Sequence, residues 1–398
     1  MPRLRRWLFW AHLFSGAVAG LFILFFAITG SLLAYERPIL ARADESYKVQ
    51  PGPARLSISE LLHRATFRPT AVTVLAKPDA PILLTAGRRD LYMVDPHTGD
   101  VLGAPSPRLR RFFATVTSLH RWFGLETNHR QAAAAVKGAA VLVFLFLLLS
   151  GAVLWFPSRL TSSALRIRSR FMKRSTWRAR GWNWHHVAGL WTGLPLLVIV
   201  VTGTIMAYPW ANALLFQVAG TPVPERIDVA PARAANHEPR EDRRRGGSRG
   251  RKEAHQPDLD SAFAAVAASH PGWRTITMRL QPAQEKDSFA FTVDDADGGR
   301  PAAKTQVVVT MDGGSRLNLR ELPFTSQPRG QRWRTWVRFT HTGEAAGWLG
   351  ETIAFISALG ACILALTGLQ MFCQRSLRAG FWTNDTGKAG INTGGTMD

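Results

Sequence analysis

The chain has 398 residues and a formal net charge of +21, with 49 Lys and Arg against 28 Asp and Glu. This charge alone would suit a nucleic-acid-binding protein, but the basic residues gather beside four long apolar windows, which argues against that class. The two cysteines, Cys362 and Cys373, lie on one expected helix and are too far apart for a disulfide.

The four apolar windows predict four membrane-spanning helices, because about 20 apolar residues cross a bilayer. The windows are residues 13–35, 132–156, 187–209 and 348–373. The first continues into Ser31–Tyr35 without a small-x-small cleavage site, so we expect a retained helix rather than a cleaved signal peptide.

Basic residues set the expected topology. Arg3, Arg5 and Arg6 precede the first window, and eight Arg and Lys residues fill the short loop after the second. Short basic loops stay in the cytoplasm, so both termini are expected there. The expected segments are helix one (1–35), an exterior segment (36–131), helix two (132–156), a basic cytoplasmic loop (157–181), helix three (182–209), an exterior segment (210–347), helix four (348–373) and a cytoplasmic tail (374–398).

Each exterior segment is predicted to be a small α+β module. The first has a capped helix at 57–65, where Ser57 and Glu60 form a capping-box pattern, followed by strands at 71–75, 81–84 and 91–95. The second has a helix at 258–267 and strands at 275–280, 289–293 and 306–310. An Arg-rich run at about 235–256 has no apolar face, and we expect a disordered insert.

The first and third helices carry matching residues at a constant offset of 173 positions. The matches are His12 with His185, Gly16 with Gly189, Gly20 with Gly193, Thr29-Gly30 with Thr202-Gly203, and Tyr35 with Tyr208. A fixed offset over so many positions marks an internal repeat. The bundle is therefore expected to be built from two repeats, each with a histidine near the start of an apolar helix.

Four histidines share one feature: a small residue follows four positions later, on the same helix face. These are His12, His120, His185 and His341, followed by Gly16, Gly124, Gly189 and Ala345. The expected topology places one pair (His12, His185) near the cytoplasmic face and the other (His120, His341) near the exterior face. Cofactor ligands in bundles lie on facing helices, and imidazole is an ordinary axial ligand of haem iron.

We therefore expect two b-type haems, with iron held by His12 and His185 in one and by His120 and His341 in the other. His186 is an alternative to His185, although Leu190 occupies its fourth following position. His129 is an alternative to His120, because it lies nearer the apolar window. Zinc usually takes three or four converging ligands, and no Cys-x-x-Cys-His is present for covalent c-type haem. Nearby arginines (Arg121, Arg332, Arg334, Arg338) are candidates for binding haem propionates or an anionic chelate.

The chain resembles the PepSY-associated transmembrane family, which includes iron-regulated membrane proteins and inner-membrane ferrisiderophore reductases. The residues that carry the resemblance are the His12–Tyr35 helix, Leu119–Trp122, Ser150-Gly151, Trp155–Pro157, His341–Glu344 and Thr367-Gly368. The exterior segments resemble PepSY units, with Val94–Gly99 matching their usual end.

The resemblance implies a bacterial inner-membrane oxidoreductase that passes electrons across the membrane through haem b and reduces a ferric siderophore or another ferric chelate. The chain has no Gly-x-Gly-x-x-Gly after a strand and no Walker motif, so electrons would come from quinol or a separate reductase. The alternative is a non-enzymatic PepSY membrane protein that acts as a sensor or protease modulator. A transporter is less favoured, because the helices lack matching Gly/Pro-broken segments.

Overall fold

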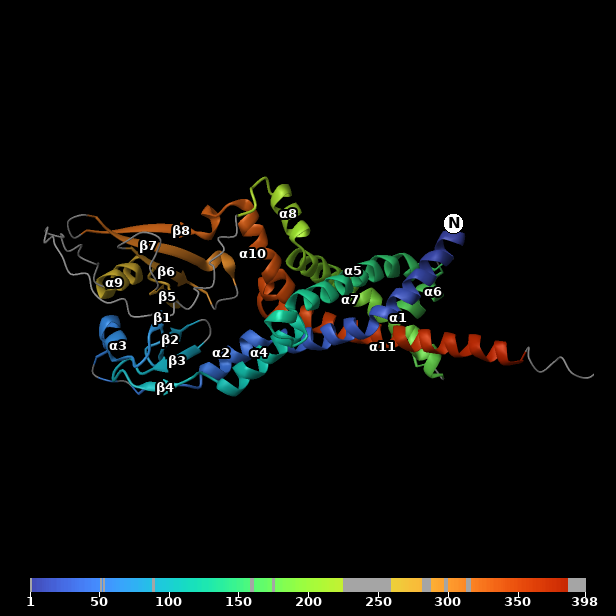
Figure 1. The fold of residues 1–398 in the computed structure, drawn as a ribbon, viewed down its shortest axis with the longest axis horizontal. Coiled ribbons are helices and arrows are strands. Elements are labelled where there is room, and N and C mark those ends of the chain that lie inside the picture. The colour runs from blue at the N-terminus through green and yellow to red at the C-terminus, as the bar shows by residue number, and fades with distance from the viewer. Residues whose placement is uncertain are drawn as a thin grey trace, which may run out of the picture. The chain divides into compact units, whose positions relative to one another are not determined.

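The computed structural model describes residues 2–385 apart from 51, 53, 88–89, 158–160, 174–175, 225–258, 281–287, 297–299 and 313–315. The chain forms two compact units. One unit is helical and takes residues from 1–46, 106–212 and 334–398; the other takes residues from 47–105 and 213–333 and contains the sheet (Figure 1).

Four helices of the helical unit have the length and apolar composition needed to cross a membrane. They are α1 (Pro2–Leu33), α5 (Arg130–Trp155), α7 (Trp177–Ala207) and α11 (Gly347–Asp385). Each covers nearly all of one of the windows expected to span the bilayer, and the protein is a multi-pass membrane protein. Large apolar side chains remain exposed on these helices, among them Val18 at 78% and Leu194 at 73%, as expected for surfaces that face lipid.

The four long helices pack in a ring. α1 contacts α5 and α11, and α7 contacts the same two helices, so α1 and α7 lie on opposite corners. Small side chains allow this close packing: Ala19 and Ala365 are buried with Ile23, and Ala27 and Ala361 with Leu196. The two helices that carry the matching histidines, α1 and α7, are therefore diagonal to each other in the bundle.

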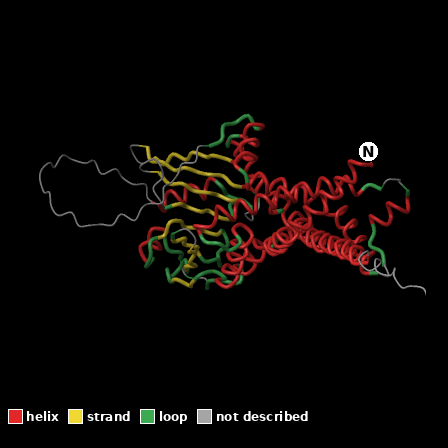
Figure 2. The backbone as a smooth tube through the Cα atoms, turned by 45° about the vertical axis from the view of Figure 1, so that its right-hand side comes forward, coloured by secondary structure: helices red, strands yellow, loops and turns green. Residues whose placement is uncertain are grey.

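Shorter helices occur along the chain besides the four long ones, and Figure 2 draws the helices in red and the strands in yellow. Five of the shorter helices are α2 (Glu36–Asp44), α4 (Pro107–Trp122), α6 (Ser162–Ser169), α8 (Pro209–Val218) and α10 (Arg329–Thr342), with short 3-10 turns η1 (Thr127–His129) and η4 (Glu344–Ala346) before α5 and α11. Residues 36–46 and 106–131, which the sequence analysis placed in the first exterior segment, belong to the helical unit instead. The α4 helix was missed because its apolar residues are interrupted by four arginines.

The second unit contains one continuous antiparallel sheet in the order β4-β3-β2-β1-β5-β6-β7-β8. Its strands are β1 (Pro69–Leu75), β2 (Ile82–Ala86), β3 (Asp90–Val94), β4 (Val101–Gly103), β5 (Thr275–Arg279), β6 (Ser288–Asp294), β7 (Lys304–Asp312) and β8 (Arg316–Pro323). The expected strands are confirmed, whereas β4 and β8 were not predicted. The two predicted modules share a sheet, because β1 pairs with β5 and the hydroxyls of Thr73 and Thr277 lie 2.9 Å apart across that pair.

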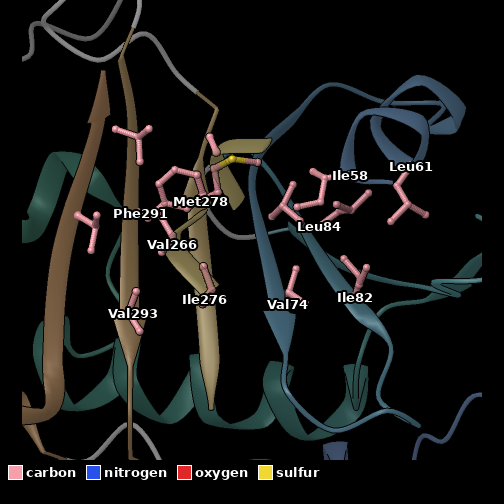
Figure 3. Close-up of a cluster of buried hydrophobic side chains, with 14 of the residues drawn as sticks. Ile58, Leu61, Val74, Ile82, Leu84, Val266, Ile276, Met278, Phe291 and Val293 are labelled. Atoms are coloured by element: carbon pink, nitrogen blue, oxygen red, sulfur yellow. The ribbon is translucent and has the colours of Figure 1, made fainter. Parts of the chain in front are cut away.

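One face of the sheet carries the core (Figure 3), beneath α3 (Ile58–Arg64) and α9 (Leu259–Ser269). Alternate strand positions such as Leu84, Ile276 and Phe291 point into it and are fully buried. The predicted cap on α3 is present, with the Glu60 backbone N–H donating to Ser57 Oγ at 3.1 Å. The Arg-rich run at about 235–256 lies outside the described residues.

Candidate redox centre: four histidines held by hydroxyl groups

The His12 and His185 imidazoles are each held by a hydroxyl on a neighbouring helix. His12 Nδ1 lies 2.8 Å from Ser150 Oγ of α5, and His185 Nδ1 lies 2.9 Å from Thr367 Oγ1 of α11. Both hydroxyls donate their own proton to a carbonyl one turn earlier in their helix, Phe146 O at 2.7 Å and Ile363 O at 2.6 Å. Each hydroxyl oxygen must therefore accept, so Nδ1 carries the proton and Nε2 keeps a free lone pair.

His120 and His341 repeat this arrangement. His120 Nδ1 lies 2.8 Å from Thr29 Oγ1 of α1, and His341 Nδ1 lies 3.2 Å from Thr202 Oγ1 of α7. Thr29 and Thr202 also donate to backbone carbonyls of their own helices. His341 Nδ1 has a second acceptor, the Ile199 carbonyl at 2.9 Å. In all four cases the structure holds the ring through Nδ1 and leaves Nε2 for another ligand.

A glycine follows each of these hydroxyl residues and lies against the imidazole. A Cβ built on the glycine would be 3.3 Å from the His12 ring at Gly151, 3.6 Å from His185 at Gly368, 3.5 Å from His120 at Gly30 and 3.2 Å from His341 at Gly203. A Cβ would crowd the ring at Gly151 and Gly203, whereas at Gly30 and Gly368 it would be in ordinary van der Waals contact. The hydroxyl before each glycine gives the hydrogen bond. The Ser/Thr-Gly pair is therefore a holder for one imidazole, used four times.

The His12 and His185 rings face each other across the bundle. Their centroids are 6.4 Å apart and their planes are nearly perpendicular, at 87°. Two metal–imidazole bonds of about 2.0 Å each, added to the two ring radii, give a centroid separation of about 6 Å. The centroid separation is therefore compatible with one metal ion held by both imidazoles. His120 and His341 are also close enough for the charge of one to act on the other.

The donor set fits haem iron better than a bare metal ion. Within the part of the chain that the structure describes, no group of three or more His, Cys, Asp or Glu side chains converges on a metal position. Two imidazoles without further protein ligands would suit an ion whose remaining ligands come from a macrocycle. Hydroxyls that accept from Nδ1 also fix the tautomer and orientation of the ligating rings.

Only His12 and His185 have the predicted small residue on their own helix face. Gly16 and Gly189 do lie one turn after His12 and His185, but a Cβ there would meet a leucine of the adjoining helix at 3.7 and 3.6 Å, which is ordinary packing. His120 and His341 lie in the last turn of their helices, so the residue four positions later is outside the helix: Gly124 is in a left-handed turn at φ 74°, and Ala345 is in η4. The relation between i and i+4 on one helix face therefore does not apply to the second pair.

The two alternative histidines are placed differently. His186 Nδ1 bonds the Trp182 carbonyl of its own helix at 2.9 Å, and its ring lies 4.0 Å from the Trp182 ring. His129 is exposed in η1. His120 precedes Ser150 by four more residues than His341 precedes Thr367. These four residues lie between His120 and the start of α5, so Ser150 and Thr367 have the same place in their helices.

The arginines singled out from the sequence are spread over different surroundings. Arg338 lies 3.9 Å from Glu344, which Arg37 also approaches at 3.9 Å. Burial lowers the pKa of Arg334 from its usual value. Arg121 lies against the ring of Trp122, at 5.6 Å from its centroid.

Comparison with known proteins places the chain in a family. The model of the PepSY-associated TM region matches residues 9–375, a span that contains all four histidines and the four Ser/Thr-Gly pairs. The chain belongs to this family. No curated protein matches the chain. Membership of this family agrees with the four membrane helices.

Proposed function

We propose that the protein is an inner-membrane oxidoreductase that carries two b-type haems and passes electrons across the membrane to a ferric chelate in iron uptake. His12 and His185 would hold one haem iron, and His120 and His341 the other. The observation that carries this proposal is the fourfold use of one holder: in each case a Ser or Thr hydroxyl that donates its own proton to a backbone carbonyl lies within hydrogen-bond distance of Nδ1. This arrangement favours the tautomer whose Nε2 can bind a metal ion.

Bis-histidine haem supplies one-electron transfer at iron. The chain's own residues position that chemistry. Ser150, Thr29, Thr202 and Thr367 keep each imidazole in the tautomer that presents Nε2. The surrounding apolar helices exclude water, which stabilises the neutral rings and limits reorganisation when charge changes.

The expected orientation makes the reaction directional. The short loop between α5 and α7 and the region before α1 are rich in Arg, which favours the cytoplasm for that end. The His12–His185 pair would then accept electrons from quinol or a separate reductase. The His120–His341 pair would deliver one electron to Fe(III), giving Fe(II) on the exterior side.

Reduction by sealed proteoliposomes tests the proposal. Vesicles containing the protein and an internal reductant would receive an external ferric chelate, and Fe(II) would be trapped outside with ferrozine. We expect Fe(II) formation with the unaltered protein and almost none with His12→Ala or His341→Ala. His63→Ala is the matched control, because His63 lies on α3 in the sheet unit, and it should leave the rate unchanged. A protein that contains two haems but reduces no ferric chelate would contradict the assignment of the acceptor.

A further inference from the structure

Three cations surround the indole ring of Trp122, at the end of α4. The guanidinium carbons of Arg121 and Arg130 each lie 5.6 Å from the ring centroid, and Lys137 Nζ lies 4.9 Å from it. Cations within about 6 Å of an indole face are attracted by its electron density. These four residues are called the Trp122 cluster below.

The turn at the end of α4 helps to build this cluster. Phe123 and Gly124 both have positive φ, at 54° and 74°, and their N–H groups donate to the Leu119 and Ser118 carbonyls. These bonds end α4, and the chain then passes through η1 into α5. Arg130 and Lys137 lie seven positions apart on α5, two helical turns, and so share the face that meets Trp122.

The Trp122 cluster concentrates positive charge without local compensation. Among the ion pairs of the described residues, none joins Arg121, Arg130 or Lys137 to a carboxylate. Like charges repel one another, and the indole offsets this repulsion only in part. Guanidinium and ammonium groups gathered in this way are suited to binding anionic oxygens.

The Trp122 cluster also lies beside the second histidine pair. Arg121 follows His120 directly in α4. Lys137 interacts electrostatically with both His120 and His341, and its Nζ donates to the Arg121 carbonyl at 3.4 Å. An anion bound by these cations would therefore be next to the imidazoles that hold the outer redox centre.

We propose that the Trp122 cluster is the docking site of the electron acceptor, and that this acceptor is an anionic, carboxylate-rich ferric chelate. The inference rests on the proposed function, because it takes His120 and His341 as the point where electrons leave. We prefer a soluble chelate to a lipid phosphate as the bound anion. A lipid headgroup at the surface would need only the exposed Arg121 and Arg130, whereas Lys137 is half-buried and its charge acts on both His120 and His341.

The test uses gallium(III) citrate, a carboxylate chelate whose metal is not reduced, so that binding is measured without electron transfer. The full chain in phosphatidylcholine nanodiscs would be titrated by calorimetry. We expect Lys137→Gln and Arg130→Gln each to weaken binding about tenfold, the size of a lost charge-assisted hydrogen bond. Arg111→Gln is the matched control, since Arg111 is an exposed arginine of α4 outside the Trp122 cluster, and it should bind like the unaltered chain. Binding should also weaken with added salt.

Three results would overturn this inference. Equal affinity in Lys137→Gln and Arg111→Gln would remove the cluster from the site. If the substitutions reduced binding of phosphatidylglycerol but not of gallium citrate, the cluster would be a lipid site. If Lys137→Gln changed the reduction potential of one haem and left gallium citrate binding intact, the cations would be partners of haem propionates. Intact gallium citrate binding in a protein without haem would instead reject the proposed function while keeping the anion site.

Discussion

Replacing Ser150 with alanine should loosen the haem held by His12 and His185. Ser150 is 3% exposed, and its Oγ accepts from His12 Nδ1 at 2.8 Å while donating to the Phe146 carbonyl at 2.7 Å. Alanine removes that acceptor and adds no bulk. A buried N–H without a partner costs about 1–3 kcal/mol. When a metal-bound histidine loses its hydrogen-bond partner, metal affinity falls about ten- to a hundredfold. This corresponds to about 1.4–2.8 kcal/mol, which agrees with the cost of the unpaired N–H.

Thr202→Val is the matched comparison, because it removes the equivalent hydroxyl beside His341. There Nδ1 keeps the Ile199 carbonyl as an acceptor at 2.9 Å, so we expect a loss of less than about tenfold. Transfer of haem from each purified variant to excess apomyoglobin, followed at the Soret band, gives the two dissociation rates. Equal rates in the two variants, or a rate for Ser150→Ala like that of the unaltered protein, would refute the role given to the hydroxyls.

Three further outcomes follow from the contacts. His186→Ala should keep both haems in a pyridine haemochrome count, because His186 bonds the Trp182 carbonyl of its own helix; loss of one haem would make it a ligand. Phe291→Ala should destabilise the sheet unit by about 3–5 kcal/mol, seen as an earlier loss of β-sheet circular dichroism on heating, since Phe291 is 1% exposed. The hydrogen bond from Lys48, whose Nζ lies 3.2 Å from the Asp79 carboxylate, lowers the Asp79 pKa below 3.8. The stability that this interaction adds to the fold is present above the unfolded pKa of Asp79 and is lost as pH falls through its folded pKa. Because Lys48→Met removes the hydrogen bond, it should raise the Asp79 pKa in a carboxyl NMR titration.

Hydropathy was sufficient to predict the membrane helices, because the bilayer imposes one length and one composition on any spanning segment. The four histidines could be selected from the repeat and from the expected topology. The role of the Ser/Thr-Gly pairs could not be predicted from the sequence, because Ser150 contacts an imidazole that is 138 positions away in the chain. The clue available in the sequence was the repeated pair itself, with Thr29 and Thr202 each following a matched histidine by the same distance.

The sheet shows a different limit of sequence reasoning. Alternation of apolar residues predicted most strands, since one face is buried under α3 and α9. It did not predict that β1 and β5 would pair, because residues about 200 positions apart leave no local signal of register. The strand β4 was missed because it has only three residues, and its Val101 and Leu102 are exposed.

The most direct test is a pyridine haemochrome count with reduced-minus-oxidised spectra of the purified full chain, made with ample iron and haem supply. We expect two b-type haems per chain in the unaltered protein. We expect one in His185→Ala and one in His120→Ala, with the remaining haem spectrally distinct in the two variants. A protein without haem, or one that keeps both haems in these variants, would contradict the account and favour a sensor or protease-modulating role.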